Sequence, residues 1–204
     1  MKVGVLRFPG TNCDRDVGRW LQDQGHQVHW LWHSDLFAVS DFEAIAIPGG
    51  FSFGDYLRSG AVAARSRALE SVREAAAKGK PVLGICNGFQ ILCEAGLLPG
   101  ALLPNMSGLF IDDWVTLESG QKSGVRVRLP VAHGDGRFFI SHDERKVLED
   151  REQIWWRYEG ELNGSVDRIA GVMNREKNVR GLMPHPERAY ESWMGGVDGW
   201  KFWI

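Results

Sequence analysis

Short apolar runs and helical periodicities alternate along the first half of the chain. Four largely apolar runs predict strands at residues 2–6, 28–32, 44–47 and 81–83. Apolar residues recur at helical spacing between these runs, first over residues 17–21 and then over a long stretch from Ala61 to Ala76. This alternation predicts an α/β fold with a doubly wound, mostly parallel sheet and flanking helices.

The pattern changes after Gly100, where the segments become shorter. Five of them predict a smaller, partly antiparallel set of strands at residues 113–118, 124–129, 137–140, 166–172 and 179–183. Residues 142–163 have no clear periodicity, and no linker or repeat interrupts the chain. We therefore expect one domain over residues 1–204.

Cys86 is the first candidate for a catalytic residue. It lies between an apolar run and a helical segment and is flanked by Gly84 and Gly88. Glycines at these positions permit a sharp strand-to-helix elbow, which holds a side chain up at the edge of the sheet. The helix that follows directs the positive end of its dipole at the sulfur and favours a negative charge there. A buried structural thiol is the commoner fate of an intracellular cysteine, but this geometry favours a nucleophile.

A base for this nucleophile is found at His185, after the apolar segment 179–183, and Glu187 lies two residues further on. In an extended segment this spacing puts both side chains on one face. The carboxylate can then orient the imidazole while its other nitrogen takes the thiol proton. Cys86, His185 and Glu187 are therefore our predicted catalytic triad.

The elbow and the His-Pro-Glu segment together resemble the class I, triad-type glutamine amidotransferases, whose core is flavodoxin-like. Four further blocks resemble, more narrowly, the glutaminase subunits of phosphoribosylformylglycinamidine synthase, an enzyme of purine biosynthesis. They are residues 8–16 (FPGTNCDRD), 48–58 (PGGFSFGDYLR), 131–138 (VAHGDGRF) and 183–189 (MPHPERA). The resemblance thus covers nearly the whole chain.

The resemblance implies hydrolysis of L-glutamine through a thioester on Cys86, with ammonia passed to a larger synthetase subunit that uses ATP and Mg²⁺. That subunit converts formylglycinamide ribonucleotide to formylglycinamidine ribonucleotide, and a small third subunit is usual. An oxyanion formed during the attack needs backbone N–H donors. The elbow suggests Asn87 as one donor, and the resemblance suggests a second from the loop at Gly49 and Gly50, most of all Gly50.

The resemblance also implies a substrate site. Gln90 matches the position that hydrogen-bonds the substrate glutamine, and His133 and Gly134 match the segment that holds its amino-acid end. From the sequence alone, Gln90 is equally compatible with a position facing solvent.

Composition narrows the remaining classes of function. The net charge is −2, from 24 basic and 26 acidic residues, so we expect neither nucleic acid nor a membrane as a partner. Three cysteines and the absence of a signal-peptide pattern indicate a reducing cytoplasm. Neither a G-x-G-x-x-G motif nor a phosphate loop is present, so we expect no cofactor on this chain.

Other histidines, cysteines and tryptophans give no prediction of catalytic chemistry. We expect no metal site at His26, His29 and His33, because positions three apart in a strand point to opposite faces. Cys93 is predicted to be a core thiol, and Cys13 is assigned no chemistry. The tryptophans Trp193, Trp200 and Trp203 indicate core and tail packing, with a docking surface as the less favoured reading.

Two alternatives to the synthase subunit remain open. One is a free-standing cysteine peptidase or glutamyl hydrolase with the same triad. The other is a non-catalytic binding subunit, against which the intact set of Cys86, His185 and Glu187 speaks.

Overall fold

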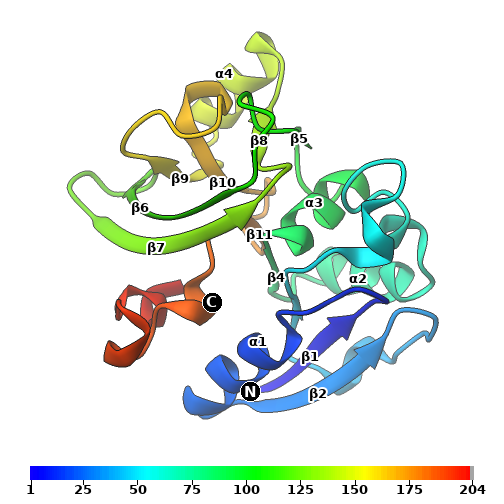
Figure 1. Cartoon of the computed structure of the whole chain (residues 1–204). Helices are drawn as coiled ribbons and strands as arrows, with labels where there is room; N and C mark the ends of the chain where they lie inside the picture. Colours follow the sequence, from blue (N-terminus) through cyan, green and yellow to red (C-terminus); the bar gives the residue numbers. More distant parts are fainter. Residues whose placement is uncertain (203–204) are drawn as a thin grey trace.

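A nine-stranded mixed sheet forms the centre of the computed structural model, which describes residues 1–202 (Figure 1). Its strands, in spatial order, are β2 (Gln27–Trp32), β1 (Lys2–Arg7), β3 (Ala44–Ile47), β4 (Val82–Ile85), β11 (Val179–Leu182), β10 (Ile169–Met173), β9 (Ile154–Tyr158), β6 (Ile111–Ser119) and β7 (Arg126–His133). A separate two-stranded sheet pairs β5 (Ala101–Leu103) with β8 (Arg137–Phe139). Trp203, for which a prediction was made above, lies outside the described residues.

Five neighbouring strands, from β2 to β11, are parallel, as the alternation of strands and helices predicts. Helix α1 (Asp14–Asp23) joins β1 to β2 and lies on one side of this half, while α2 (Ala68–Ala77) and α3 (Asn87–Glu94) lie on the other (Figure 1). Every residue of β3 and β4 is buried, because helices cover both faces. The predicted doubly wound, mostly parallel core is confirmed.

The remaining four strands, β10, β9, β6 and β7, pair antiparallel with their neighbours. This half returns the chain to the parallel half at β11, which pairs with β4. Residues 142–163, for which the sequence shows no clear periodicity, contain helix α4 (His142–Asp150) and strand β9. A capping box between Ser141 and Glu144 begins α4, and only Leu148 of this helix is buried, so the apolar periodicity used for prediction is missing there.

The prediction of one long helix from Ala61 to Ala76 is wrong. Helix α2 begins at Ala68, and residues Ala63–Arg65 form a separate 3-10 turn, η3. Ser66 ends that turn with extended dihedral angles, φ −69° and ψ 149°, which interrupt the helix. Ala63, Ala64 and Ala68 are all buried, so small apolar residues on both sides of this break mimic one helical stripe.

The parallel arrangement determines where the site forms. The carboxyl ends of β1, β3, β4 and β11 lie along the same edge of the sheet, where ligands of such sheets bind. The loops that leave these ends carry Cys13, Gly50, Cys86 and His185 respectively. Within residues 1–202, none of the helices is long and apolar enough to cross a membrane.

Candidate active site

Cys86 occupies the single residue between β4 and α3, and its backbone is strained. Its φ of 52° and ψ of −108° lie in a region that residues with a side chain rarely adopt. The conformation is held because the Cys86 N–H donates to the Leu182 carbonyl of β11 at 2.8 Å. Gly88 makes the elbow possible, since a Cβ there would lie 1.9 Å from the Ile47 carbonyl oxygen. The predicted elbow is therefore present, and it raises the sulfur above the strand ends.

His185 and Glu187 form a buried pair at the end of β11. The distance from His185 Nδ1 to Glu187 Oε1 is 2.6 Å, and the two residues are 2% and 1% exposed. Residues Pro186–Arg188 form a 3-10 turn, η5, rather than the extended segment that the sequence analysis assumed. Burial alone would lower the pKa of His185, but the Glu187 carboxylate and the Cys86 sulfur outweigh it and raise the pKa to about 10.

Cys86 and His185 face each other across Gly49. A Cβ on Gly49 would lie 3.3 Å from Cys86 Cβ and 2.9 Å from His185 Cε1, so the absence of a side chain leaves room for both. His185 Nε2 is buried and has no hydrogen-bond partner of standard geometry. The Cys86 thiol makes a weak contact of 3.8 Å with the Ala132 carbonyl oxygen. The free imidazole nitrogen and the sulfur are thus neighbours that are not yet aligned for proton transfer.

Two small hollows flank Cys86. They share Gly50, Phe51, Phe110 and Ala132 as lining residues. One hollow, of about 170 Å³, is completed by Asn12, Cys13, His185 and Arg188. The other, of about 120 Å³, is completed by Asp55, Ser59, Gln90, His133, Gly134 and Asp135. We call them the Cys13 hollow and the His133 hollow.

Both proposed oxyanion donors lie beside the sulfur. The Asn87 N–H belongs to the first turn of α3 and has no acceptor within its helix. Gly50 lines both hollows, whereas Gly49 lines neither, and no acceptor for the Gly50 N–H exists within residues 1–202. A side chain at Gly50, with φ of 142°, would meet Asn12 N at 2.7 Å. This arrangement favours Gly50 over Gly49, and the role stays a prediction.

The side chains of Asn87 and Gln90 tie the site together. Asn87 Oδ1 accepts from the Ser52 N–H at 3.2 Å, and Asn87 Nδ2 donates to Gln90 Oε1 at 2.8 Å. Gln90 Nε2 in turn donates to the Asp135 carbonyl at 2.7 Å. Gln90 is buried rather than facing solvent. Its amide retains one N–H for a substrate, so its role in binding glutamine stays a prediction.

The sequence analysis missed Asn105, a buried residue that organises the segment around His133. Its Oδ1 lies 3.1 Å from His133 Nδ1 and accepts from the Gly136 N–H at 3.2 Å. Its Nδ2 donates to the carbonyl oxygens of Leu109 and His133 at 2.9 and 2.8 Å. Because these two acceptors fix the amide orientation, His133 Nδ1 must carry the proton. Nothing in the sequence around Asn105 signals this role, since its partners are 28 and 31 residues away.

His133 is therefore held as a neutral imidazole. Burial, and then the charge of His185, lower its pKa to about 4. His133 Nε2 is a buried acceptor without a partner among the described residues. The neighbouring Gly134 accepts from the Asn105 N–H through its carbonyl oxygen at 2.8 Å and lines the same hollow. The predicted substrate segment thus lies beside Cys86.

Cys13, to which the sequence analysis assigned no chemistry, also lies in the site. Its sulfur accepts from Arg188 Nη2 at 3.1 Å, and its N–H donates to the Gly49 carbonyl at 3.3 Å. Burial and then the Glu187 carboxylate raise the pKa of the Cys13 thiol far above its usual value. A loop after β1 is polar in sequence, and only the fold brings it to β11. Cys93, by contrast, is a buried thiol of α3 that lines neither hollow, as predicted.

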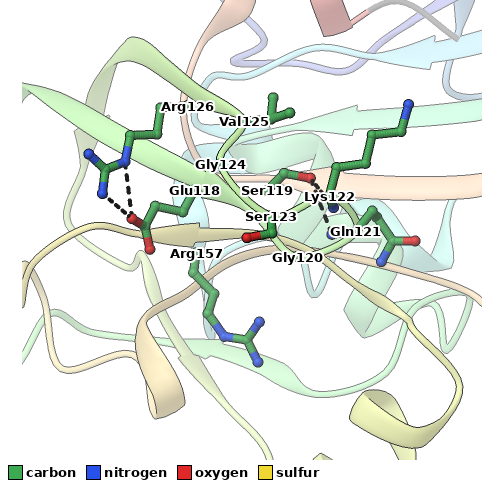
Figure 2. A pocket seen from close by; sticks show the side chains of 10 residues that line it. All are labelled: Glu118, Ser119, Gly120, Gln121, Lys122, Ser123, Gly124, Val125, Arg126 and Arg157. Carbon is green, nitrogen blue, oxygen red and sulfur yellow. Dashed lines mark hydrogen bonds and ion pairs between the residues drawn. The ribbon is translucent and has the colours of Figure 1, made fainter.

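A concavity larger than either hollow lies elsewhere, at the hairpin that joins β6 to β7, with a volume of about 670 Å³ (Figure 2). Figure 2 shows Arg126 turned toward Glu118, with which it makes hydrogen bonds of 2.8 and 3.1 Å. Arg157 is paired with Asp167 at 2.8 Å. Both guanidinium groups that line the concavity are thus neutralised, and none of its lining residues belongs to the triad.

Metal-ligating side chains gather at one place in residues 1–202. One ligand atom each of Cys13, His185 and Glu187 lie within 4.8 Å of one another. His26, His29 and His33 join no such group in the part of the chain that the structure describes.

Comparison with known proteins agrees with this geometry. The family model of the CobB/CobQ-like glutamine amidotransferase domain matches residues 1–199. The chain is 50% identical over 212 residues to the phosphoribosylformylglycinamidine synthase subunit PurQ of Nostoc sp., covering 98% of this chain and 94% of the relative. It is 49% identical over 210 residues to PurQ of Helicobacter hepaticus, with the same coverage.

A solved structure extends the comparison to three dimensions. A chain in the structure of PurLQS from Thermotoga maritima superimposes with a TM-score of 0.87 at 45% identity, covering 98% of this chain and 94% of that chain. The sequence identity over nearly the full length and the similarity of the fold therefore indicate the same family. The chain belongs to the CobB/CobQ-like glutamine amidotransferases and, within them, to the PurQ family of phosphoribosylformylglycinamidine synthase subunits.

Proposed function

We propose that this chain is the glutaminase subunit of a phosphoribosylformylglycinamidine synthase and hydrolyses L-glutamine to glutamate and ammonia. The observation that carries the proposal is the buried His185–Glu187 pair facing Cys86 on its strained elbow. A nucleophile, a base and a group that orients the base are the three parts of such a reaction. The glutamine amidotransferase family model, which matches residues 1–199, supports glutamine as the amide that is attacked.

Each residue of the site has its own role in the proposed hydrolysis. Cys86 Sγ attacks the side-chain amide carbon of glutamine, and the N–H groups of Gly50 and Asn87 stabilise the oxyanion. His185 donates a proton to the departing nitrogen, ammonia leaves, and a glutamyl thioester remains on Cys86. Water then attacks the thioester, with His185 accepting its proton, and glutamate is released. Glu187 holds the imidazole through Nδ1 throughout.

The two hollows supply the substrate's contacts. The His133 hollow contains the acceptors that an α-ammonium group requires, including Asp55 and Asp135. It adjoins the sulfur, so the amino-acid end of glutamine fits there while the amide reaches Cys86. His133, Gly134 and Gln90 are then the groups that hold the substrate.

The ammonia acceptor is expected on a partner. PurLQS of Thermotoga maritima includes PurL and PurS besides PurQ, which supports a larger synthetase subunit and a small third subunit for this chain as well. We place the ATP, Mg²⁺ and formylglycinamide ribonucleotide sites on the synthetase. Large apolar side chains beside the hollows provide a docking surface: Phe51, Tyr56, Leu57, Leu109 and Phe110 are all exposed, Leu57 to 91%.

Docking is also expected to activate the site. In the free chain the thiol contacts the Ala132 carbonyl, and His185 Nε2 is unpartnered. The loop from Phe53 to Leu57 connects the docking surface to Gly50 and has positive φ at Phe53, Asp55 and Leu57. A shift of this strained loop would move the oxyanion donor, and losing one such donor costs about 10²–10³ in rate.

The test compares glutamine turnover by the isolated chain, by the assembled complex, and by the complex loaded with ATP and formylglycinamide ribonucleotide. We expect a slow isolated chain and a fast loaded complex. Leu57→Asp should prevent activation, and Val147→Asp, which changes an exposed apolar residue of α4, is the matched control. An isolated chain as fast as the loaded complex would favour a free-standing hydrolase instead.

A further inference from the structure

More metal-ligating atoms gather at the Cys13 hollow, and at Glu187 beside it, than the proposed reaction uses. Cys13, His185 and Glu187 each contribute one ligand atom to a group that spans no more than 4.8 Å, and all three residues are buried. The proposed hydrolysis assigns roles to His185 and Glu187 but none to the Cys13 sulfur. A second thiol beside a catalytic pair therefore needs an explanation of its own.

Cys86 borders the same space beside Gly49 and offers a further sulfur atom. A Cβ on Gly49 would lie 3.2 Å from Cys13 Sγ and 3.3 Å from Cys86 Cβ, so both cysteines border the space that this glycine leaves open. The hollow of about 170 Å³ is lined by Cys13, Cys86 and His185 together. It is large enough for an ion and a bound water, since one water occupies about 30 Å³ of liquid.

Two of the ligating atoms are unpartnered. His185 Nε2 and Glu187 Oε2 are buried without hydrogen bonds in residues 1–202. Buried polar atoms of this kind are normally satisfied by protein, water or an ion. A bound ion would satisfy these two atoms and would replace the contact of Arg188 with the Cys13 sulfur at 3.1 Å, while the bond between His185 Nδ1 and Glu187 Oε1 remains.

We propose that the Cys13 hollow is an inhibitory site for Zn²⁺, with Cys13 and Cys86 as sulfur ligands and His185 and Glu187 as nitrogen and oxygen ligands. Two thiolates, an imidazole and a carboxylate are a ligand set that zinc takes in tetrahedral geometry. Ligand atoms of such a site lie roughly 3.5 Å apart at bond lengths of about 2.0–2.3 Å. The ligand atoms of Cys13, His185 and Glu187 lie within 4.8 Å of one another, and rotation of the Cys86 side chain brings a second sulfur to the same ion. Each thiol and the His185 imidazolium give a proton to solvent on binding, and no oxidation or reduction is involved.

The charges around the hollow permit the ion. Arg188 contacts the Cys13 sulfur at 3.1 Å and also pairs with Asp16 at 3.3 Å. Its side chain is 38% exposed, so it can turn from the sulfur toward Asp16 and solvent. Thiolate and carboxylate charges then exceed the charge of the ion. Mg²⁺ and Ca²⁺ prefer oxygen ligands and are not expected to bind.

Zinc and glutamine exclude each other at this site. The ion occupies the sulfur that attacks the amide and the imidazole that moves the proton. We therefore expect inhibition by Zn²⁺ that glutamine relieves. The same inhibition depends on Cys13, which distinguishes this site from a general affinity of zinc for a Cys-His pair.

Zinc binding is tested separately from the proposed reaction, by competition with a zinc-sensitive dye on the metal-free full chain. Wild type should bind one Zn²⁺ per chain. Cys13→Ser should weaken binding by about 10-fold or more, whereas Cys93→Ser, which removes the buried thiol of α3, should not change it. Alkylation of Cys86 with a glutamine-like electrophile should prevent binding. Equal zinc affinity in wild type and Cys13→Ser would overturn the proposal.

Cobalt provides a second measurement that needs no variant. Co²⁺ in wild type should give the intense visible absorption of a tetrahedral site and a sulfur-to-cobalt charge-transfer band. An octahedral spectrum without sulfur bands would contradict the proposed ligands. In the assembled synthase, Zn²⁺ should inhibit glutamine-dependent synthesis but not synthesis from added ammonium. Equal inhibition of both would assign the effect to the partner and overturn the proposal. Failure of all glutaminase activity, with zinc binding intact, would instead count against the proposed function.

Discussion

His185 Nδ1 lies 2.6 Å from Glu187 Oε1, and only Pro186 separates the two residues in the chain. The 3-10 turn of Pro186–Arg188 brings the carboxylate back under the ring, and Pro186 fixes the backbone at its first position. With both side chains at or below 2% exposure, the contact is shielded from water. The local turn therefore determines which imidazole nitrogen faces Cys86.

The nucleophile is tested by comparing cysteine variants. Cys86→Ala should abolish glutamine hydrolysis by the loaded complex, because no other sulfur lies on the elbow. Cys93→Ala should retain most of it, since Cys93 donates to the Pro99 carbonyl at 3.6 Å and lines neither hollow. Steady-state ammonia release from both variants checks this. Comparable losses in the two variants, with folding intact, would remove Cys86 from its assigned role.

The base and its orienting group should differ in importance. His185→Ala removes the proton carrier and should lower kcat by about 10²–10⁴, the range for general acid–base catalysis. Glu187→Gln leaves an imidazole that is less well held and less readily charged, so its loss should be smaller. Measured kcat values of the two variants in the complex decide this. A larger loss for Glu187→Gln than for His185→Ala would mean that the roles are misassigned.

Asn105 should affect both stability and substrate binding. Asn105→Ala removes the partner of the buried His133 carbonyl oxygen, of the partly buried Leu109 carbonyl oxygen and of the Gly136 N–H. Each lost partner costs about 1–3 kcal/mol, although water can satisfy some of them. We expect the free energy of unfolding to fall by about 2–4 kcal/mol and KM for glutamine to rise more than kcat falls. Denaturant titration and steady-state kinetics measure the two effects. An unchanged KM would separate Asn105 from the substrate site.

His133 should make the fold sensitive to acid. Its pKa is about 4 in the folded chain against an ordinary value of 6.5, so below pH 6.5 the unfolded chain binds a proton that the folded chain does not. The resulting loss of stability develops as the pH falls from 6.5 to about 4 and is on the order of 3 kcal/mol.

His133→Gln, which cannot take up this proton, should flatten the dependence of the unfolding free energy on pH within that window. The exposed His142 is the control, because His142→Gln alters a position at the start of α4, outside the site. Denaturant midpoints at several pH values measure both variants. A wild-type slope in His133→Gln would show that another group titrates.

The sequence predicts those parts of the site that depend on short segments. The elbow at Cys86 is readable because flanking glycines and the change of periodicity lie within a few residues. His185 and Glu187 are readable for the same reason. The central parallel strands β3 and β4 are readable because helices cover both of their faces, and their continuous apolar runs follow from this.

Long-range contacts explain what the sequence analysis missed. Cys13 joins the site through Arg188, which lies 175 residues away in the chain. Asn105 acts through residues 28 and 31 positions away, and no local pattern signals these pairings. Helix α4 was not predicted because only one of its residues, Leu148, is buried, and a single apolar position shows no helical periodicity. The helix break at Ser66 was not predicted because buried alanines lie on both sides of it and imitate one continuous helical stripe.

The most direct test of the account is to trap the covalent intermediate. The loaded complex is mixed with glutamine and quenched in acid, and the digested chain is analysed by mass spectrometry. We predict a glutamyl group on the peptide that contains Cys86, absent from His185→Ala complexes that cannot expel ammonia. A glutamyl group on Cys13 or Cys93, or ammonia release with no adduct at Cys86 under any quench time, would contradict the account.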